Sequence, residues 1–305
     1  MQMTESIDIA TENHSRLMHR VAYASVLVAL TLILVKAYAW WLSGSVSLLA
    51  SLVDSSIDML ASLINFFAIR YALQPADEEH RFGHGKAESL AGLGQSMFIM
   101  GSAVFLLLQG VDRILNPQPL ESLDIAIVVM VISILLTLGL VWYQRKVIAQ
   151  THSIAVKADS LHYLSDLLTN LGIIVALVLS ALQFPQADPI LAIAISLYIF
   201  YTAIQIWNES IQHLLDRELP EHEQQQIVQI ARQHSDVLGV HGLRTRQSGR
   251  QKIIQMHVEL DGRLPLYRAH RICDQVEADL MAAFPSADIL IHLDPYVPEG
   301  TAGPL

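Results

Sequence analysis

The sequence predicts an all-α bundle of six transmembrane helices followed by a small cytoplasmic α+β domain. Of its 305 residues, 52% are hydrophobic and only 16% are charged, whereas soluble domains carry nearer a quarter charged residues. The long apolar runs all lie before about residue 210, and the remainder has the composition of a soluble domain. We therefore expect a transmembrane domain over residues 1–211 and a cytoplasmic domain over residues 212–305.

Six segments are long enough to cross a membrane as helices, because a bilayer core of about 30 Å needs roughly 20 apolar residues. They are 18–42, 46–71, 90–114, 122–145, 158–182 and 188–211. The first, fourth and sixth are plainly apolar, whereas the second and fifth carry acidic residues in their first halves. Acids inside a membrane segment are expensive, so these two segments are where we look for function.

Basic residues indicate which helix ends lie in the cytoplasm, since cytoplasmic loops are enriched in Lys and Arg. Those that decide the orientation are Arg16, Arg20, Arg70, Arg81, Lys86, Arg145, Lys146, Lys157 and Arg217. They stand at the first segment, between the second and third, between the fourth and fifth, and after the sixth. The opposite connections are poor in basic residues. Both termini are therefore expected in the cytoplasm.

The residues after 212 predict the order α-β-β-α-β. Residues 220–234 read as an amphipathic helix, and 266–284 as a second one. Stretches 240–246 and 253–260 alternate roughly with period two around a Ser-Gly turn signal, and 287–292 reads as a third strand. Two helices can cover one face of such a sheet, so we expect a small two-layer domain.

Composition also excludes several classes of protein. The formal net charge of −10 argues against nucleic acid as a partner, because phosphate binding needs clustered Lys and Arg. The single cysteine, Cys273, cannot form a disulfide within the chain. We see no removable signal peptide at the N-terminus. Neither an H-E-x-x-H nor a G-x-S-x-G motif occurs, so the sequence does not predict an enzyme.

The strongest chemical signal is a pair of motifs inside the second and fifth segments: Asp54-x-x-x-Asp58 and His162-x-x-x-Asp166. Residues four apart share a helix face, so each helix offers two ligands in one direction. Three carboxylates and one imidazole suit a tetrahedral site for zinc or a similar ion. The alternative is that the acids cap helices or pair with Lys or Arg. The two segments hold no basic partner at that depth, because Arg70 is three turns or more from Asp58.

Such a site also suits coupling to protons. A histidine must be neutral to bind metal, so metal binding releases protons. Crowded carboxylates take up protons readily when the metal leaves. Metal and protons would then compete for the same four side chains, which is the simplest physical basis for an antiporter.

Two further clusters are candidate metal sites. Asp77, His80 and His84 lie within eight residues of a glycine-containing loop between the second and third segments, where the alternative is an ordinary solvated loop. The second cluster is scattered through the cytoplasmic domain, and only folding could bring its members together. Its members are His241, His257, His270, His292 and Asp294. Lys86 and Asp216 flank the membrane domain on its cytoplasmic side and could form an ion pair.

Several stretches closely resemble the cation diffusion facilitator family, its bacterial zinc and iron efflux members in particular. They are residues 44–58, 74–77, 82–88, 158–166, 214–216, 243–249 and 291–295, which are spread over nearly the whole chain. The resemblance implies a six-helix transporter of the bacterial inner membrane, with a cytoplasmic ferredoxin-like domain that binds metal and forms a homodimer. It implies divalent metal ions and protons as the transported species, and membrane lipid as the surroundings.

The resemblance also implies roles for individual residues. Asp54, Asp58, His162 and Asp166 match the transport site, and the loop and cytoplasmic-domain clusters match accessory zinc sites, the latter paired and tightening the dimer. Leu161 matches a hydrophobic gate residue, and Lys86 with Asp216 matches a charge pair between protomers. Leu293 departs from the family pattern, because near relatives often have Gln there.

The resemblance leaves alternatives open. The same ligands accept Zn²⁺, Cd²⁺ and Fe²⁺, so the physiological ion is not fixed by the sequence. A metal-gated channel would move metal without needing a pH gradient, and a membrane metal sensor would move none. An intramembrane metalloprotease would need a general base beside the metal, for which no motif is present.

Overall fold

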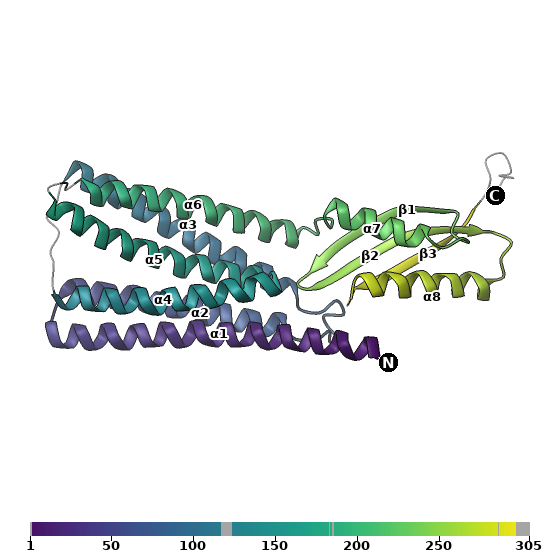
Figure 1. Ribbon diagram of the computed structural model, residues 1–305, viewed down its shortest axis with the longest axis horizontal. Helices are drawn as coiled ribbons and strands as arrows, with labels where there is room; N and C mark the ends of the chain where they lie inside the picture. Colours follow the sequence, from purple (N-terminus) through teal and green to yellow (C-terminus); the bar gives the residue numbers. More distant parts are fainter. Residues whose placement is uncertain (1, 117–123, 183, 185, 286, 297–305) are drawn as a thin grey trace.

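The computed structural model describes residues 2–116, 124–182, 184, 186–285 and 287–296. The molecule is elongated, with a bundle of six long helices at one end and an α/β domain at the other (Figure 1). The bundle helices are α1 (Gln2–Ser43), α2 (Val46–Ala72), α3 (Lys86–Leu115), α4 (Asp124–Thr151), α5 (Ile154–Ala181) and α6 (Ala187–Leu214). All six predicted segments are therefore helices, although the first two residues of the predicted fourth segment lie outside the described residues.

All six bundle helices are long and apolar enough to cross a membrane. Their outward faces carry large apolar side chains that a soluble protein would bury, among them Leu27, Ile64 and Phe105, each more than 60% exposed. In a bilayer these side chains meet hydrocarbon, and a helix satisfies its own backbone hydrogen bonds there. The exposed apolar surface is thus what a membrane-spanning bundle requires.

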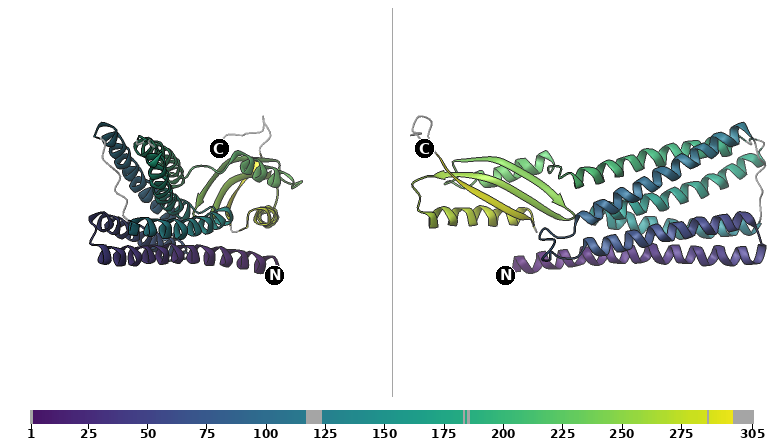
Figure 2. Two further views of the ribbon diagram at one scale, coloured as in Figure 1. Left: turned by 60° about the vertical axis from the view of Figure 1, so that its left-hand side comes forward. Right: turned by 180° about the vertical axis from the view of Figure 1, so that it is seen from behind.

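The helices form two groups that come together near the α/β domain. Helices α1, α2 and α4 lie side by side, α3 runs along α6, and α5 lies between the two groups (Figures 1 and 2). The tight turn from α1 into α2 needs Gly44, whose φ of 63° is in the left-handed region. Ser45 then caps α2 by accepting a hydrogen bond from the backbone of Leu48.

Three helices begin at least four residues earlier than the apolar runs predict. Helix α1 begins at residue 2 instead of 18, α3 at 86 instead of 90, and α5 at 154 instead of 158. The residues added to α1 and α3 are largely polar, whereas those added to α5 are mostly apolar and buried in the bundle. All three additions lie at the end of the bundle next to the α/β domain (Figure 1). Apolar length predicts the part of a helix that needs lipid, whereas the helix itself can begin before that part.

The C-terminal domain has the predicted order. Its elements are α7 (Glu221–Arg232), β1 (Gly239–Ser248), β2 (Gln251–Asp261), α8 (Leu266–Ala283) and β3 (Asp288–Tyr296). The sheet order is β1-β2-β3, with β2 antiparallel to β1 and parallel to β3. Alternate residues of β2 (Ile254, Met256, Val258 and Leu260) pack against α7 and α8 and form the core. The residues between them point to the opposite, open face of the sheet.

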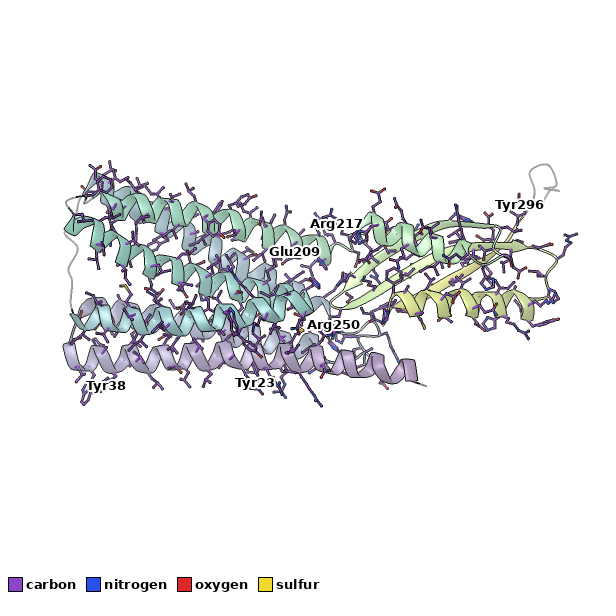
Figure 3. All side chains as sticks on the ribbon, viewed as in Figure 1. Tyr23, Tyr38, Glu209, Arg217, Arg250 and Tyr296 are labelled. Carbon is purple, nitrogen blue, oxygen red and sulfur yellow. The ribbon has the colours of Figure 1, made fainter. Side chains whose placement is uncertain are left out.

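The tip of the β1–β2 hairpin contacts the membrane bundle. A Cβ atom on Gly85, just before α3, would lie 2.6 Å from the backbone oxygen of Ser248, so the two segments meet backbone to backbone. Arg250 at the same tip lies at the junction (Figure 3), and its guanidinium is 2.9 Å from Nδ1 of His14 in α1. The hairpin therefore connects the two parts of the chain. The predicted division between residues 211 and 212 stays a prediction, with α6 extending to Leu214.

Candidate metal sites and the family of the chain

The intramembrane motifs bring three of their four side chains together. Asp58, His162 and Asp166 place one ligand atom each within 4.8 Å of one another. The Nε2 atom of His162 lies 3.1 Å from Oδ1 of Asp58, and the two side chains are only 7% and 14% exposed. The fourth, Asp54, is one turn from Asp58 and lines the same cavity without joining this group. The donors are one imidazole and carboxylates, which fits Zn²⁺ and related ions.

A cavity of about 630 Å³ leads away from this cluster. Its walls include residues later in α3 and α5, such as Gln109 and Asn170, and Ser51 early in α2. It therefore extends toward the end of the bundle that is remote from the α/β domain. Hydroxyl and amide side chains are part of its lining, which gives a cation polar groups along its way.

The other side of the cluster is closed. Leu161, which is 6% exposed, belongs to an apolar layer in which α3, α5 and α6 meet. The layer also contains Ile99, Ala158, Ile199 and Ala203. An ion could not pass such a layer without losing its hydration, so access to the cluster is one-sided in this conformation. Leu161 is thus part of the apolar layer next to the cluster, and its role as a gate residue stays a prediction.

Sequence reasoning missed Lys36 of α1. Its ammonium donates hydrogen bonds to the hydroxyl of Ser55 (2.6 Å) and the backbone oxygen of Ser51 (3.2 Å). It lines the same cavity as the aspartates. The expectation that no basic group lies at this depth considered the second and fifth segments alone, and the cation comes from the first. A single Lys in an otherwise apolar run was the signal that could have revealed it.

A second acid of α5 was also missed. Asp159 is 1% exposed, and its carboxylate accepts hydrogen bonds from Ser25 (2.6 Å), Gln144 (2.8 Å) and Gln95 (3.2 Å). These donors come from α1, α4 and α3, so one carboxylate joins four helices. Because neutral side chains donate its hydrogen bonds, we interpret the role of Asp159 as structural.

The loop residues Asp77, His80 and His84 also come together. The Asp77 carboxylate lies 3.3 Å from Nδ1 of His80 and 3.3 Å from Nε2 of His84. A hydrogen bond from the backbone N–H of His80 lowers the pKa of Asp77, so the carboxylate stays ionised. His84 is 6% exposed, although it is in a loop. One carboxylate and two imidazoles in this arrangement can hold a divalent ion.

The cytoplasmic-domain cluster forms on the open face of the sheet. His241, His257 and His292 are partners in the strand register, one on each strand. Asp294 lies among them, with oxygens 3.3 Å, 2.8 Å and 3.2 Å from the three rings respectively. The hydrogen bond with His257 is the main reason why the pKa of Asp294 is lowered. The donor set fits zinc.

Two details of this cluster differ from the expectation. His270 lies on α8, where its nearest acidic partner is Asp274 at 3.7 Å, and among the described residues it does not join the cluster. Glu259, which the sequence did not single out, lies 3.1 Å from His241. The two-residue alternation of β2 puts Glu259 on the same face as His257, and that was the available signal.

Gly242 shapes the strand at this cluster. The register of β1 and β2 shifts after His241, as in a β-bulge, and Gly242 there has a φ of 61°. A Cβ atom at Gly242 would lie only 2.9 Å from the ring of His257. Glycine therefore allows both the backbone turn and the close approach of the two histidines.

Lys86 and Asp216 form an ion pair of 2.9 Å within one chain. Asp216 also pairs with Arg246 of β1 at 3.2 Å. Partial burial opposes ionisation of Asp216, but the two cations outweigh it and lower its pKa. The predicted partners therefore do meet, and a pairing between protomers stays a prediction.

The chain matches two family models in succession. The cation efflux transmembrane domain matches residues 22–215, and the cytoplasmic domain of cation efflux proteins matches residues 219–296. The chain belongs to the cation efflux family. It is thus a multi-pass bacterial membrane transporter of cations. Its second domain is the metal-binding dimerisation domain of this family.

Individual relatives extend over nearly the whole chain. The cation-efflux pump FieF of Klebsiella pneumoniae is 50% identical over 93% of this chain and 95% of its own length. FieF of Serratia proteamaculans is 51% identical over 95% of this chain and 97% of its own length. A solved structure of CzrB in a Zn form is 34% identical and covers 29% of this chain and 98% of its own, with a TM-score of 0.25.

Proposed function

We propose that this transporter exports divalent metal ions, zinc first among them, in exchange for protons. The observation that carries the proposal is the buried group of Asp58, His162 and Asp166 at the inner end of a one-sided cavity. Asp54 lines that cavity and serves as the fourth ligand once an ion draws it in. Cd²⁺ and Fe²⁺ are accepted by the same donors and are secondary substrates.

Protons and metal compete for these side chains. His162 has to be neutral to bind a metal ion, and a buried group of carboxylates without its ion is stabilised by taking up protons. Because each species displaces the other from one site, an inward proton gradient empties the site on the outer side. This is exchange at a single site, with no need for a separate proton path.

Transport then requires the site to open alternately to each side. With the α/β domain in the cytoplasm, as the basic residues indicate, the present conformation is open outward. Its cytoplasmic side is closed by the layer that contains Leu161. In the opposite state that layer separates and the cavity of about 630 Å³ closes. Both termini are cytoplasmic in this arrangement.

The remaining clusters regulate or stabilise a homodimer. Zinc at His241, His257, His292 and Asp294 would fix the open face of the sheet, where a second protomer can dock. His270 is placed to complete this ligand set only after a rearrangement or from the partner chain. Asp77, His80 and His84 form an accessory site beside the hairpin tip, close to the junction of the two domains. These cytoplasmic ions are resident, whereas the ion at Asp58 is cargo.

The deciding experiment is zinc flux into vesicles that contain the purified full chain, with and without an imposed pH gradient. Wild type and Asp54→Ala are compared. Flux that follows the gradient and is lost in the variant supports the proposal. Flux that ignores the gradient means a channel, and absence of flux in the wild type means a sensor. Flux retained in Asp54→Ala means that the cargo site lies elsewhere.

A further inference from the structure

Lys36 is a charged residue inside a membrane-spanning helix, and it faces the bundle. Ser25, Ala29 and Leu32 precede it on α1 at helical spacing, and all three are buried. Lys36 therefore lies on the inward face, half-buried, within the span Asn13–Ser43. A charge at such a position is costly, which makes a functional reason the first hypothesis to test.

The ammonium does not reach for the membrane surface. Lysines near helix ends can extend toward water along the helix, but Nζ of Lys36 donates instead to Ser55 and Ser51 of α2. Both partners belong to the helix that carries Asp54 and Asp58. The packing of α1 on α2 thus holds the charge at the wall of the cargo cavity.

The charges around this cavity can be counted. Among the described residues that line it, the acidic ones are Asp54, Asp58 and Asp166. Of the same lining residues, Lys36 is the one that is a lysine or an arginine. Lys36 lines the same cavity as these carboxylates, and its ammonium donates to Ser55, which follows Asp54 in the sequence. Three ionised carboxylates and one ammonium leave two negative charges when His162 is neutral. One divalent ion then makes the cavity electrically neutral.

We propose that Lys36 is the fixed counter-charge of the cargo site and matches the site to a single divalent ion. The inference rests on the function proposed above. Lys36 is a specificity and release residue: it does not ligate the metal, and its charge keeps three carboxylates from holding the ion too tightly to let it go. Without it the site would carry three negative charges, and a bound Zn²⁺ would leave one of them uncompensated.

This role predicts that removing the charge of Lys36 strengthens metal binding, whereas a substitution that merely disturbs the structure would weaken it. Removing a positive charge from the site should tighten the binding of a divalent cation. At a separation of about 10 Å and an effective dielectric constant of about 20, a single positive charge and a divalent cation repel each other. The free energy of this repulsion is larger than the free energy that corresponds to a tenfold change in affinity. We therefore expect Lys36→Met to bind Zn²⁺ at least about tenfold more tightly and to turn over more slowly.

The test measures equilibrium Zn²⁺ binding to the full chain in lipid nanodiscs, in a background where Asp77→Ala and Asp294→Ala weaken the other two sites. Lys36→Met and Lys36→Arg are compared with this background. Tighter binding in Lys36→Met and near-background binding in Lys36→Arg support the proposal. Unchanged or weaker binding in Lys36→Met overturns it. If Lys36→Met does not fold, Lys36→Gln, which keeps a donor for Ser55, decides by the same criterion.

Two further variants separate charge from structure. Ser55→Ala removes the strongest hydrogen bond of Lys36 and leaves its charge, with Ser56→Ala as the matched control. If Ser55→Ala tightens Zn²⁺ binding as Lys36→Met does, the role is structural and the proposal fails. When Lys36→Met is added to Asp54→Asn, it should restore part of the Zn²⁺ affinity that Asp54→Asn loses. A further loss of Zn²⁺ affinity in this double variant would contradict the proposal.

The proposed function and this inference fail differently. If Asp58→Ala binds Zn²⁺ as tightly as its background, the cargo site is misplaced and the proposed function falls. If Asp58→Ala loses binding while Lys36→Met does not tighten it, the cargo site stands and only the counter-charge is wrong. In flux measurements the inference predicts a lower KM together with a lower kcat for Lys36→Met.

Discussion

The metal cluster in the membrane and the cluster on the sheet use similar side chains in opposite surroundings. His162 and Asp58 are 7% and 14% exposed between helices, whereas His241 and His292 are 50% and 66% exposed on the open face of a sheet. Buried carboxylates need a cation or protons at all times, because an unpaired charge is costly there. Exposed carboxylates are solvated by water and are stable without a bound metal ion. The first environment favours exchange, and the second favours resident metal.

The largest effect is expected in the membrane cluster. Asp166→Ala removes one ligand atom from the group with Asp58 and His162. Zinc flux should fall by about 100-fold or more, since losing even an outer partner of a metal ligand reduces affinity or activity 10–100-fold. Initial rates of zinc uptake into vesicles measure this.

The matched control for that variant is Asp112→Ala, which removes an exposed acid of α3 that is bonded to Asn116. It should transport at nearly the wild-type rate. A comparable loss in both variants would mean that the flux depends on general negative charge rather than on the cluster, and the contrast between the two regions would lose its basis.

A smaller effect is expected in the sheet cluster. Gly242→Val places a branched side chain at a φ of 61° and against the ring of His257. The left-handed backbone alone costs about 1–2 kcal/mol, and the histidines must move apart. Zinc binding to the full chain should lose its cytoplasmic component, and flux should persist at a reduced rate.

Gly242→Asn separates the two causes in that prediction, because Asn tolerates the left-handed region but still adds a Cβ. If the backbone is the main constraint, Asn should bind more zinc than Val does. Full zinc binding in Gly242→Val would show that the bulge does not shape the site. Abolished flux would show that the sheet cluster is part of transport itself.

The same contrast explains what the sequence could predict. Apolar length, amphipathic helical periodicity and two-residue alternation depend on local sequence, and together they predicted the six helices and the α-β-β-α-β order. The spacing of Asp58 with Asp54, and of Asp166 with His162, was visible for the same reason. By contrast, the register that aligns His241, His257 and His292 exists only in the folded sheet. Their candidacy therefore came largely from the family resemblance.

Other features depend on packing between distant segments. Lys36 approaches α2 from another helix, and a search within the second and fifth segments could not find it. His270 shares no register with the strand histidines, so its separation from them was equally invisible. Sequence patterns found mainly residues that act along one helix or one strand, and missed Lys36 and Glu259, whose partners lie on another element.

The smallest effect is expected at the junction of the two regions. Asp216 has a φ of 57° and pairs with Lys86 and Arg246. Asp216→Asn keeps a residue that tolerates this backbone and removes only the charge. Because the pair is partly exposed, the loss of stability near pH 7 should be below about 1 kcal/mol. Thermal unfolding of both proteins in the same detergent measures it.

The pH dependence of that difference identifies its cause. The pKa of Asp216 is lowered in the folded protein from an ordinary value of 3.8. Its ion pairs therefore stabilise the fold above that value, and the contribution disappears as the pH falls through the lowered pKa. The difference between wild type and Asp216→Asn should be constant from pH 7 to about pH 5 and vanish under stronger acid. A difference that persists at the acidic end would assign it to packing rather than to charge, and the junction would then couple the two regions by shape alone.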